Sequence, residues 1–129
     1  MSIVQKLQSI GCKLNGNYEE EVELAEEKLG ISFATDFKEY LVNFGQITLE
    51  SDELTGVIGP EYLNVVNATS QQRQYILPKY SDMYVIENLG MDGIVIWQKS
   101  NGEVYQTVPQ GIPEKIYNNF EEYLVNEIL

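Results

Sequence analysis

The side chains of this sequence that come closest to a catalytic arrangement are carboxylates. Glu50, Asp52 and Glu53 lie close together, and Glu87 and Asp92 form a second group. Two carboxylates at a suitable separation can act as general acid and base, or can cleave a glycosidic bond. Because the chain carries 20 acidic residues, such groups also arise by chance. A small carboxylate hydrolase, which would need one strongly perturbed acid in a cleft, is therefore the least favoured of three hypotheses.

Other common catalytic and metal-binding patterns are missing from the sequence. It has no histidine, which removes the commonest general base near neutral pH and the commonest zinc ligand. Cys12, the only cysteine, has no histidine to activate it and can form neither an internal disulfide nor a thiolate cluster. Residues 89–93 lack the spacing of a phosphate-binding loop, and Asp52 lacks the loop of a calcium site. We expect no enzyme activity, no metal and no cofactor.

The formal net charge of −12 narrows the choice of partner. A field of this sign repels nucleic acids and anionic membranes, and it raises the rate of encounter with a basic protein. Many soluble proteins are acidic only because charge keeps them in solution. The charge therefore argues against nucleic acid and membrane partners, and it is compatible with a basic protein partner or with simple solubility.

The length and composition favour one soluble domain. With 129 residues, 43% of them hydrophobic, the chain can build one core, and we expect a single domain over residues 1–129. The sequence contains no apolar run of membrane-spanning length, and its first residues lack the organisation of a signal peptide. We therefore expect a cytoplasmic protein.

Two short helices are predicted between Asn17 and Gly45. Asn17 followed by Glu20 has the chemistry of a helix start, and Gly30 offers a left-handed stop for the first helix. Thr35 can cap the second helix, which Gly45 ends. The apolar residues that recur at helical spacing are Val22, Ala25 and Leu29 in the first helix and Phe37, Tyr40, Leu41 and Phe44 in the second.

The rest of the chain is predicted to supply two more main helices, a short N-terminal helix and a sheet. We expect helices at residues 3–10, 62–76 and 118–128, the last with a capping box formed by Asn118 and Glu121. Strands are expected at residues 46–49, 54–58, 84–87, 94–99 and 103–108. Asn101-Gly102 predicts a type I′ hairpin between the last two strands. Pro109, Gly111 and Pro113 then predict a loop. This order indicates an α+β fold, a mostly antiparallel sheet with helices packed on one side.

The helix pair resembles the opening signature of the SUKH superfamily, the cell-wall-regulator-like (Smi/Knr-like) proteins. In that family an acidic first helix ends in a Leu-Gly-like step, and a second helix begins with aspartate and an aromatic residue and closes at Asn-Gly. Leu29-Gly30, the segment 36–41 and Asn43-Phe44-Gly45 fill these places. The sequence departs from the pattern at Phe33-Ala34, where Leu-Pro is usual, and at the inserted Phe44.

Two later segments extend the resemblance over most of the chain. Residues 87–94, followed by Ile96-Trp97, look like the glycine-punctuated turn that leads into the family's central strand. Residues 120–124 resemble its closing helix. The resemblance implies the α+β fold named above and a non-catalytic binding role. In bacteria the family serves mostly as immunity proteins against polymorphic toxins, and its eukaryotic relatives are regulatory adaptors.

The leading hypothesis is therefore an immunity protein that neutralises a cognate secreted toxin of the LXG or contact-dependent type, with a basic nuclease as the expected target. The alternative is a regulatory adaptor in a signalling or cell-wall-assembly complex. Trp97 either anchors the sheet or, if partly exposed, is a binding hot spot. The sequence leaves a homo-oligomer open. The predicted partner-binding residues are Glu50, Asp52, Glu53, Glu61, Asp82, Glu87, Asp92, Trp97, Tyr62 and Tyr84.

Overall fold

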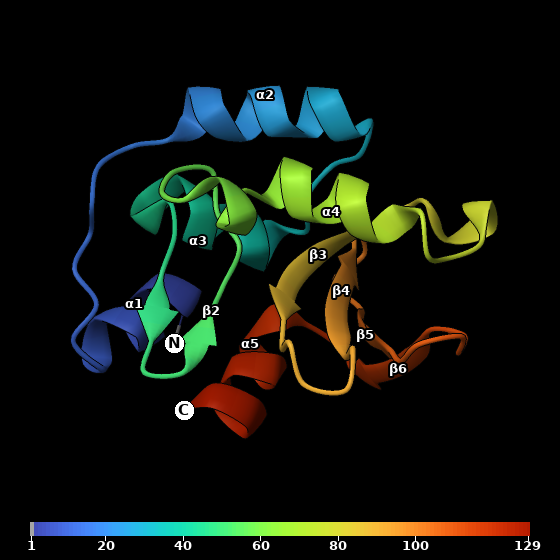
Figure 1. Ribbon diagram of the computed structural model, residues 1–129. Coiled ribbons are helices and arrows are strands. Elements are labelled where there is room, and N and C mark those ends of the chain that lie inside the picture. Colours follow the sequence, from blue (N-terminus) through green and yellow to red (C-terminus); the bar gives the residue numbers. More distant parts are fainter. Residues whose placement is uncertain (1) are drawn as a thin grey trace.

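The structure is a computed structural model that describes residues 2–129 (Figure 1). The helices are α1 Ile3–Ser9, α2 Glu19–Leu29, α3 Thr35–Phe44, α4 Val65–Arg73 and α5 Phe120–Tyr123, with short turns η1 Glu61–Leu63, η2 Pro78–Tyr80 and the π-helical η3 Leu124–Ile128. The strands are β1 Thr48–Leu49, β2 Asp52–Glu53, β3 Met83–Asn88, β4 Val95–Lys99, β5 Val104–Thr107 and β6 Glu114–Tyr117. Strands β1 and β2 form a small hairpin, and β3-β4-β5-β6 form an antiparallel sheet in that order. None of the helices in the described residues is long and apolar enough to span a membrane.

The predicted helix pair is present as α2 and α3. Gly30 ends α2 in the left-handed conformation, with φ 68°, as its position predicts. The α2 start differs, because Tyr18 occupies the N-cap position and the Asn17 side chain accepts from the Glu19 N–H instead. Ala34, not Thr35, is the N-cap of α3. The predicted apolar face of α3 is confirmed, since its four members are all buried.

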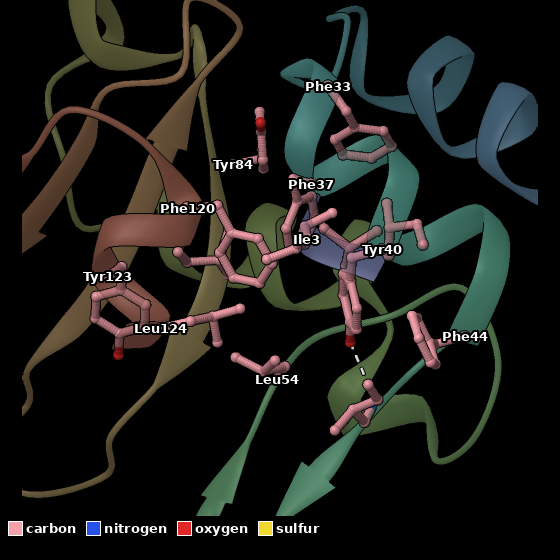
Figure 2. Close-up of a cluster of buried hydrophobic side chains, with 14 of the residues drawn as sticks. Ile3, Phe33, Phe37, Tyr40, Phe44, Leu54, Tyr84, Phe120, Tyr123 and Leu124 are labelled. Carbon is pink, nitrogen blue, oxygen red and sulfur yellow. Dashed lines mark hydrogen bonds between the residues drawn. The ribbon is translucent and has the colours of Figure 1, made fainter. Parts of the chain in front are cut away.

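The main core lies between the sheet and the helices on one side of it, α1, α3 and α5 (Figures 1 and 2). Phe37 of α3 is its centre, with ring centroids 5.4 Å from Tyr84 of β3 and 5.1 Å from Phe120 of α5. Tyr40 also packs on Phe120, at 5.5 Å. Burying several aromatic rings against one another contributes strongly to stability. The α+β fold with a mostly antiparallel sheet is confirmed.

The opposite face of the sheet carries a second, smaller core. Successive residues of a strand point to opposite faces, so Val95 and Trp97 lie on the face opposite Ile96. They pack with Met83 and Val85 of β3 and with Ala68 of α4. Helix α4 therefore covers part of this second face.

Two predicted elements of the middle region have different bounds in the structure. The second short strand is β2 at Asp52–Glu53, not residues 54–58. The helix predicted over residues 62–76 is divided into η1 and α4, because Asn64 is extended and caps α4 with its side chain. Its Oδ1 accepts from the N–H groups of Val66 and Asn67 at 2.9 and 3.3 Å.

The hairpin between β4 and β5 is confirmed, but the predicted turn type is wrong. Gly102 has φ 101°, whereas Asn101 is not in the positive-φ region. The Gly102 N–H bonds to the Lys99 carbonyl, and the Lys99 N–H bonds to the Glu103 carbonyl. This is a three-residue loop that ends in a glycine bulge. Strand β6 was not predicted, and α5 is capped by Asn119, which accepts from the Glu122 N–H, rather than by Asn118.

Candidate partner-binding surface

The β1–β2 hairpin carries the first group of predicted acidic residues. Glu50 lies exposed in the turn with φ 51°, and Asp52 and Glu53 form β2. The exposed Tyr62 of η1 donates its hydroxyl to Glu53 Oε2 at 2.5 Å, and this bond raises the pKa of Tyr62. Glu61 lies beside Tyr62 and is exposed. The hairpin and η1 therefore present one acidic surface, which we call the hairpin surface: Glu50, Asp52, Glu53, Glu61 and Tyr62.

Glu87 belongs to a buried network beneath this surface. Its side chain is 2% exposed and accepts a hydrogen bond from the Tyr123 hydroxyl of α5. Burial raises the pKa of Glu87 to about 8, and the neighbouring carboxylates of Asp52 and Glu127 act in the same direction, against the hydrogen bond from Tyr123. Glu87 is therefore mainly a neutral acid at pH 7. No group of metal-binding side chains is arranged for an ion within residues 2–129.

Asp82 and Asp92 lie at different places along the sheet. Asp82 precedes β3, and its Oδ2 is 3.9 Å from Lys99 Nζ. Asp92 is exposed in the β3–β4 turn, with φ 52°. The β3–β4 turn, the β1–β2 turn and the C-terminal helical segment lie at the same end of the molecule, the lower end in Figure 1. Asp92 is thus at the end of the molecule that carries the hairpin, whereas Asp82 is separated from Glu87 by most of the length of β3.

Three of the predicted partner-binding residues are buried, which corrects their assignment to the surface. Trp97 is fully buried, and its Nε1–H donates to Thr107 Oγ1 at 2.9 Å. Tyr84 is fully buried, with its hydroxyl between Gln98 Oε1 and the Ala34 N–H. Glu87 is the third. Both faces of β3 and β4 are packed in the region of these residues, so their polar groups are bonded internally and do not face solvent.

Asp36, part of the signature motif of α3, connects three distant elements. Its Oδ1 accepts from the Phe37 N–H and from Gln98 Nε2, at 2.8 and 3.3 Å. Its Oδ2 accepts from the N–H groups of Phe120 and Glu121, at 2.8 and 3.4 Å. A carboxylate at the start of a helix compensates the free N–H groups and the positive end of the helix dipole. Asp36 therefore joins α3, β4 and α5, and its role is structural.

The sequence did not indicate the C-terminal residues that border the acidic end. Glu127 accepts a hydrogen bond from the Tyr117 hydroxyl of β6, and Tyr123 contacts Glu87. These residues lie far from the hairpin in the sequence, and only the packing of α5 against the sheet brings them near it. No local pattern could have revealed this proximity.

The fold defines the chain as an α+β domain built from one four-stranded antiparallel sheet, a small hairpin and helices. A family model, SUKH_5, described as SMI1-KNR4 cell-wall, matches residues 2–129. The chain therefore belongs to the SUKH family, which includes toxin immunity proteins.

Comparison with solved structures gives the same fold. The crystal structure of a protein from Pseudomonas syringae pv. tomato superposes with a TM-score of 0.76 at 16% sequence identity. The match covers 97% of this chain and 95% of the other. No curated protein matched the sequence.

Proposed function

We propose that this protein is an immunity protein that acts in the cytoplasm, binds a cognate toxin and blocks its active or substrate-binding surface without catalysis. Membership in a family that includes toxin immunity proteins is the observation that carries the proposal. The net charge of −12 supports a basic toxin domain, and a nuclease is the class of toxin whose substrate-binding surface is itself basic.

The hairpin surface suits this role. Glu50 and Glu61 are exposed, and the Tyr62 hydroxyl is bonded to Glu53, so an aromatic ring is held beside the carboxylates. Carboxylates facing a nuclease can occupy the positions that phosphate groups would take, and they steer the basic partner during encounter. Tyrosine at an interface adds apolar area with one polar tip. The hairpin surface would then provide both attraction and contact.

Co-expression tests the proposal directly. Under this proposal we expect a large secreted toxin to be encoded in the adjacent gene. The protein would be produced in a sensitive host together with the C-terminal domain of that toxin, and growth and co-purification would be scored. Rescue of growth with a stable complex supports immunity by direct binding. Continued killing without a complex would contradict the cognate pairing.

Association kinetics test the role of the hairpin surface. Glu50→Gln combined with Glu53→Gln removes two charges and leaves an acceptor for the Tyr62 hydroxyl. Glu23→Gln combined with Glu27→Gln, both exposed on α2, is a control with the same change in charge. We expect the first pair to slow association more than the control and to weaken its salt dependence. Equal rates for the two pairs would exclude the hairpin surface from the interface.

A further inference from the structure

Beyond the end of α4, the surface over the second face of the sheet is hollowed. A hollow of about 390 Å³ lies over Val95 and Trp97 at this place. One wall is formed by Tyr75 and Ile76, which follow α4, and the other by Thr107, the last residue of β5, and residues 108–111 of the loop after it. Trp97 is among the residues that line the hollow, but its own side chain is fully buried, so the neighbouring side chains separate it from solvent. The volume is sufficient for one or two large apolar side chains.

Several large apolar side chains that the protein exposes lie around this hollow and a neighbouring one. Tyr75 is 71% exposed and Ile112 is 74% exposed. Leu77 and Val108 are also exposed, and a second hollow of about 430 Å³, which shares Tyr75 and Ile76, reaches Leu77 and Ile112. We call the two hollows and their rim the tryptophan groove. Exposed apolar surface that is contiguous in this way is typical of a protein interface.

The tryptophan groove is continuous with the acidic end of the molecule. Gly93 lines the first hollow, and a Cβ added to it would lie 2.6 Å from Pro109 Cγ, so the β3–β4 turn packs against the β5–β6 loop. Asp92 is the preceding residue of the same turn and is exposed. None of the ion pairs within residues 2–129 includes Asp92. A partner that covers the groove at Gly93 would therefore meet a free carboxylate at its edge.

We infer that the tryptophan groove is the apolar contact site of the toxin, and that it receives a segment in which an apolar side chain is followed by lysine or arginine. The apolar side chain would lie over Trp97, and the cation would pair with Asp92. This inference rests on the proposed function. Two copies of this chain, each with a net charge of −12, repel one another, which argues against a second copy as the occupant. A small ligand in the first hollow would leave the Ile112 side chain exposed to solvent, whereas a bound protein segment would cover this side chain.

Fluorine NMR can test the inference, because Trp97 is the only tryptophan. The protein labelled with 5-fluorotryptophan gives one ¹⁹F resonance from the groove lining, and unlabelled toxin domain is then added. Affinities are measured by calorimetry for Tyr75→Ser, for Ile112→Ser and for Leu14→Ser. Leu14, which is 52% exposed in the connection between α1 and α2, is the matched control. All three side chains are exposed, so unchanged circular dichroism and melting temperature are expected for the variants.

We expect the ¹⁹F resonance to shift on binding, and we expect the two groove variants to lose about tenfold or more in affinity while the control changes less than about twofold. If a complex forms while both groove variants bind like the wild type, with or without a ¹⁹F shift, the groove is excluded and the proposed function stands. If no complex forms with the cognate domain, the proposed function fails, and the toxin is excluded as the occupant.

Discussion

The buried acid Glu87 should make the protein less stable as the pH rises. In the folded protein its pKa is raised to about 8 by burial, whereas a glutamate in the unfolded chain ionises near 4.5. Between these values the folded state binds a proton that the unfolded state has released. The free energy of unfolding must then decrease with rising pH across this window. The stabilisation that the protonated Glu87 gives to the folded state is fully present below pH 4.5 and is lost as the pH approaches 8.

The magnitude follows from the size of the pKa shift. One bound proton changes the free energy of unfolding by about 1.4 kcal/mol per pH unit, so roughly 2.5 kcal/mol is lost between pH 5 and pH 7. Glu87→Gln has the shape of the neutral acid, still accepts from the Tyr123 hydroxyl and does not titrate. Wild type and variant should have similar stability at pH 5. At pH 7 the variant should be more stable by roughly 2.5 kcal/mol.

Urea unfolding of both proteins at pH 5, 6, 7 and 8 measures this difference. Asp52, Tyr123 and Glu127 face Glu87, and they are present in both proteins, so the difference between the two curves isolates Glu87. Glu23→Gln, on the exposed side of α2, is the control and should follow the wild type at every pH. Parallel curves for Glu87→Gln and wild type would refute the reasoning, because they would mean that Glu87 is ionised in the folded protein.

Three further changes test other parts of the structure. Tyr123→Phe removes the hydrogen bond that lowers the pKa of Glu87, so the stability loss should extend to higher pH in the same urea titration; an unchanged window would contradict this. Asp36→Ala leaves four donors without their carboxylate and should cost about 2–4 kcal/mol in urea unfolding; a loss below about 1 kcal/mol would show that Asp36 does not hold α5. Gly56→Ala would place its Cβ 2.2 Å from the Gly45 carbonyl oxygen, so the melting temperature should fall strongly, and a fall of only a degree or two would be inconsistent with this packing.

Periodicity predicted the helices that face the core. The spacing of Phe37, Tyr40, Leu41 and Phe44 determines one side of α3, and burial of that side is what keeps the helix in place. The glycine at position 30 predicted the end of α2, because the left-handed conformation there is costly for other residues. These predictions succeeded because each depends on a short range of sequence.

The missed features depend on contacts that are distant in the sequence. Strand β6 is four residues long and half exposed, and it follows a loop containing two prolines, so it has no alternating pattern of its own. The loop at Asn101 and Gly102 has a three-residue form, in which the Ser100 hydroxyl donates to the Ser32 carbonyl and Gly102 approaches Asn118. The glycine was recognised correctly, but its partners could not be predicted.

The candidate site was only partly predictable for a similar reason. Composition identified the acids of the hairpin; Glu50 is exposed in its turn, whereas Asp52 and Glu53 are half-buried in β2. The alternation in β4 separates Trp97 from Ile96, but it does not say that α4 and the β5–β6 loop cover the tryptophan. Likewise, Glu87 has an ordinary sequence environment, and its burial results from the approach of Tyr123.

The contact between Asp36 and α5 has a consequence for folding of the chain during its synthesis on the ribosome. Phe120, Tyr123 and Leu124 complete the aromatic core around Phe37, and the N–H groups of α5 are the partners of a carboxylate made much earlier in translation. Until these residues leave the exit tunnel, the nascent chain has a sheet with an open apolar face, and Oδ2 of Asp36 lacks its two donors from α5. Folding of this domain should therefore finish only after α5 has been synthesised and has left the tunnel. A cell that relied on the protein for defence would have to make it before the threat arrives.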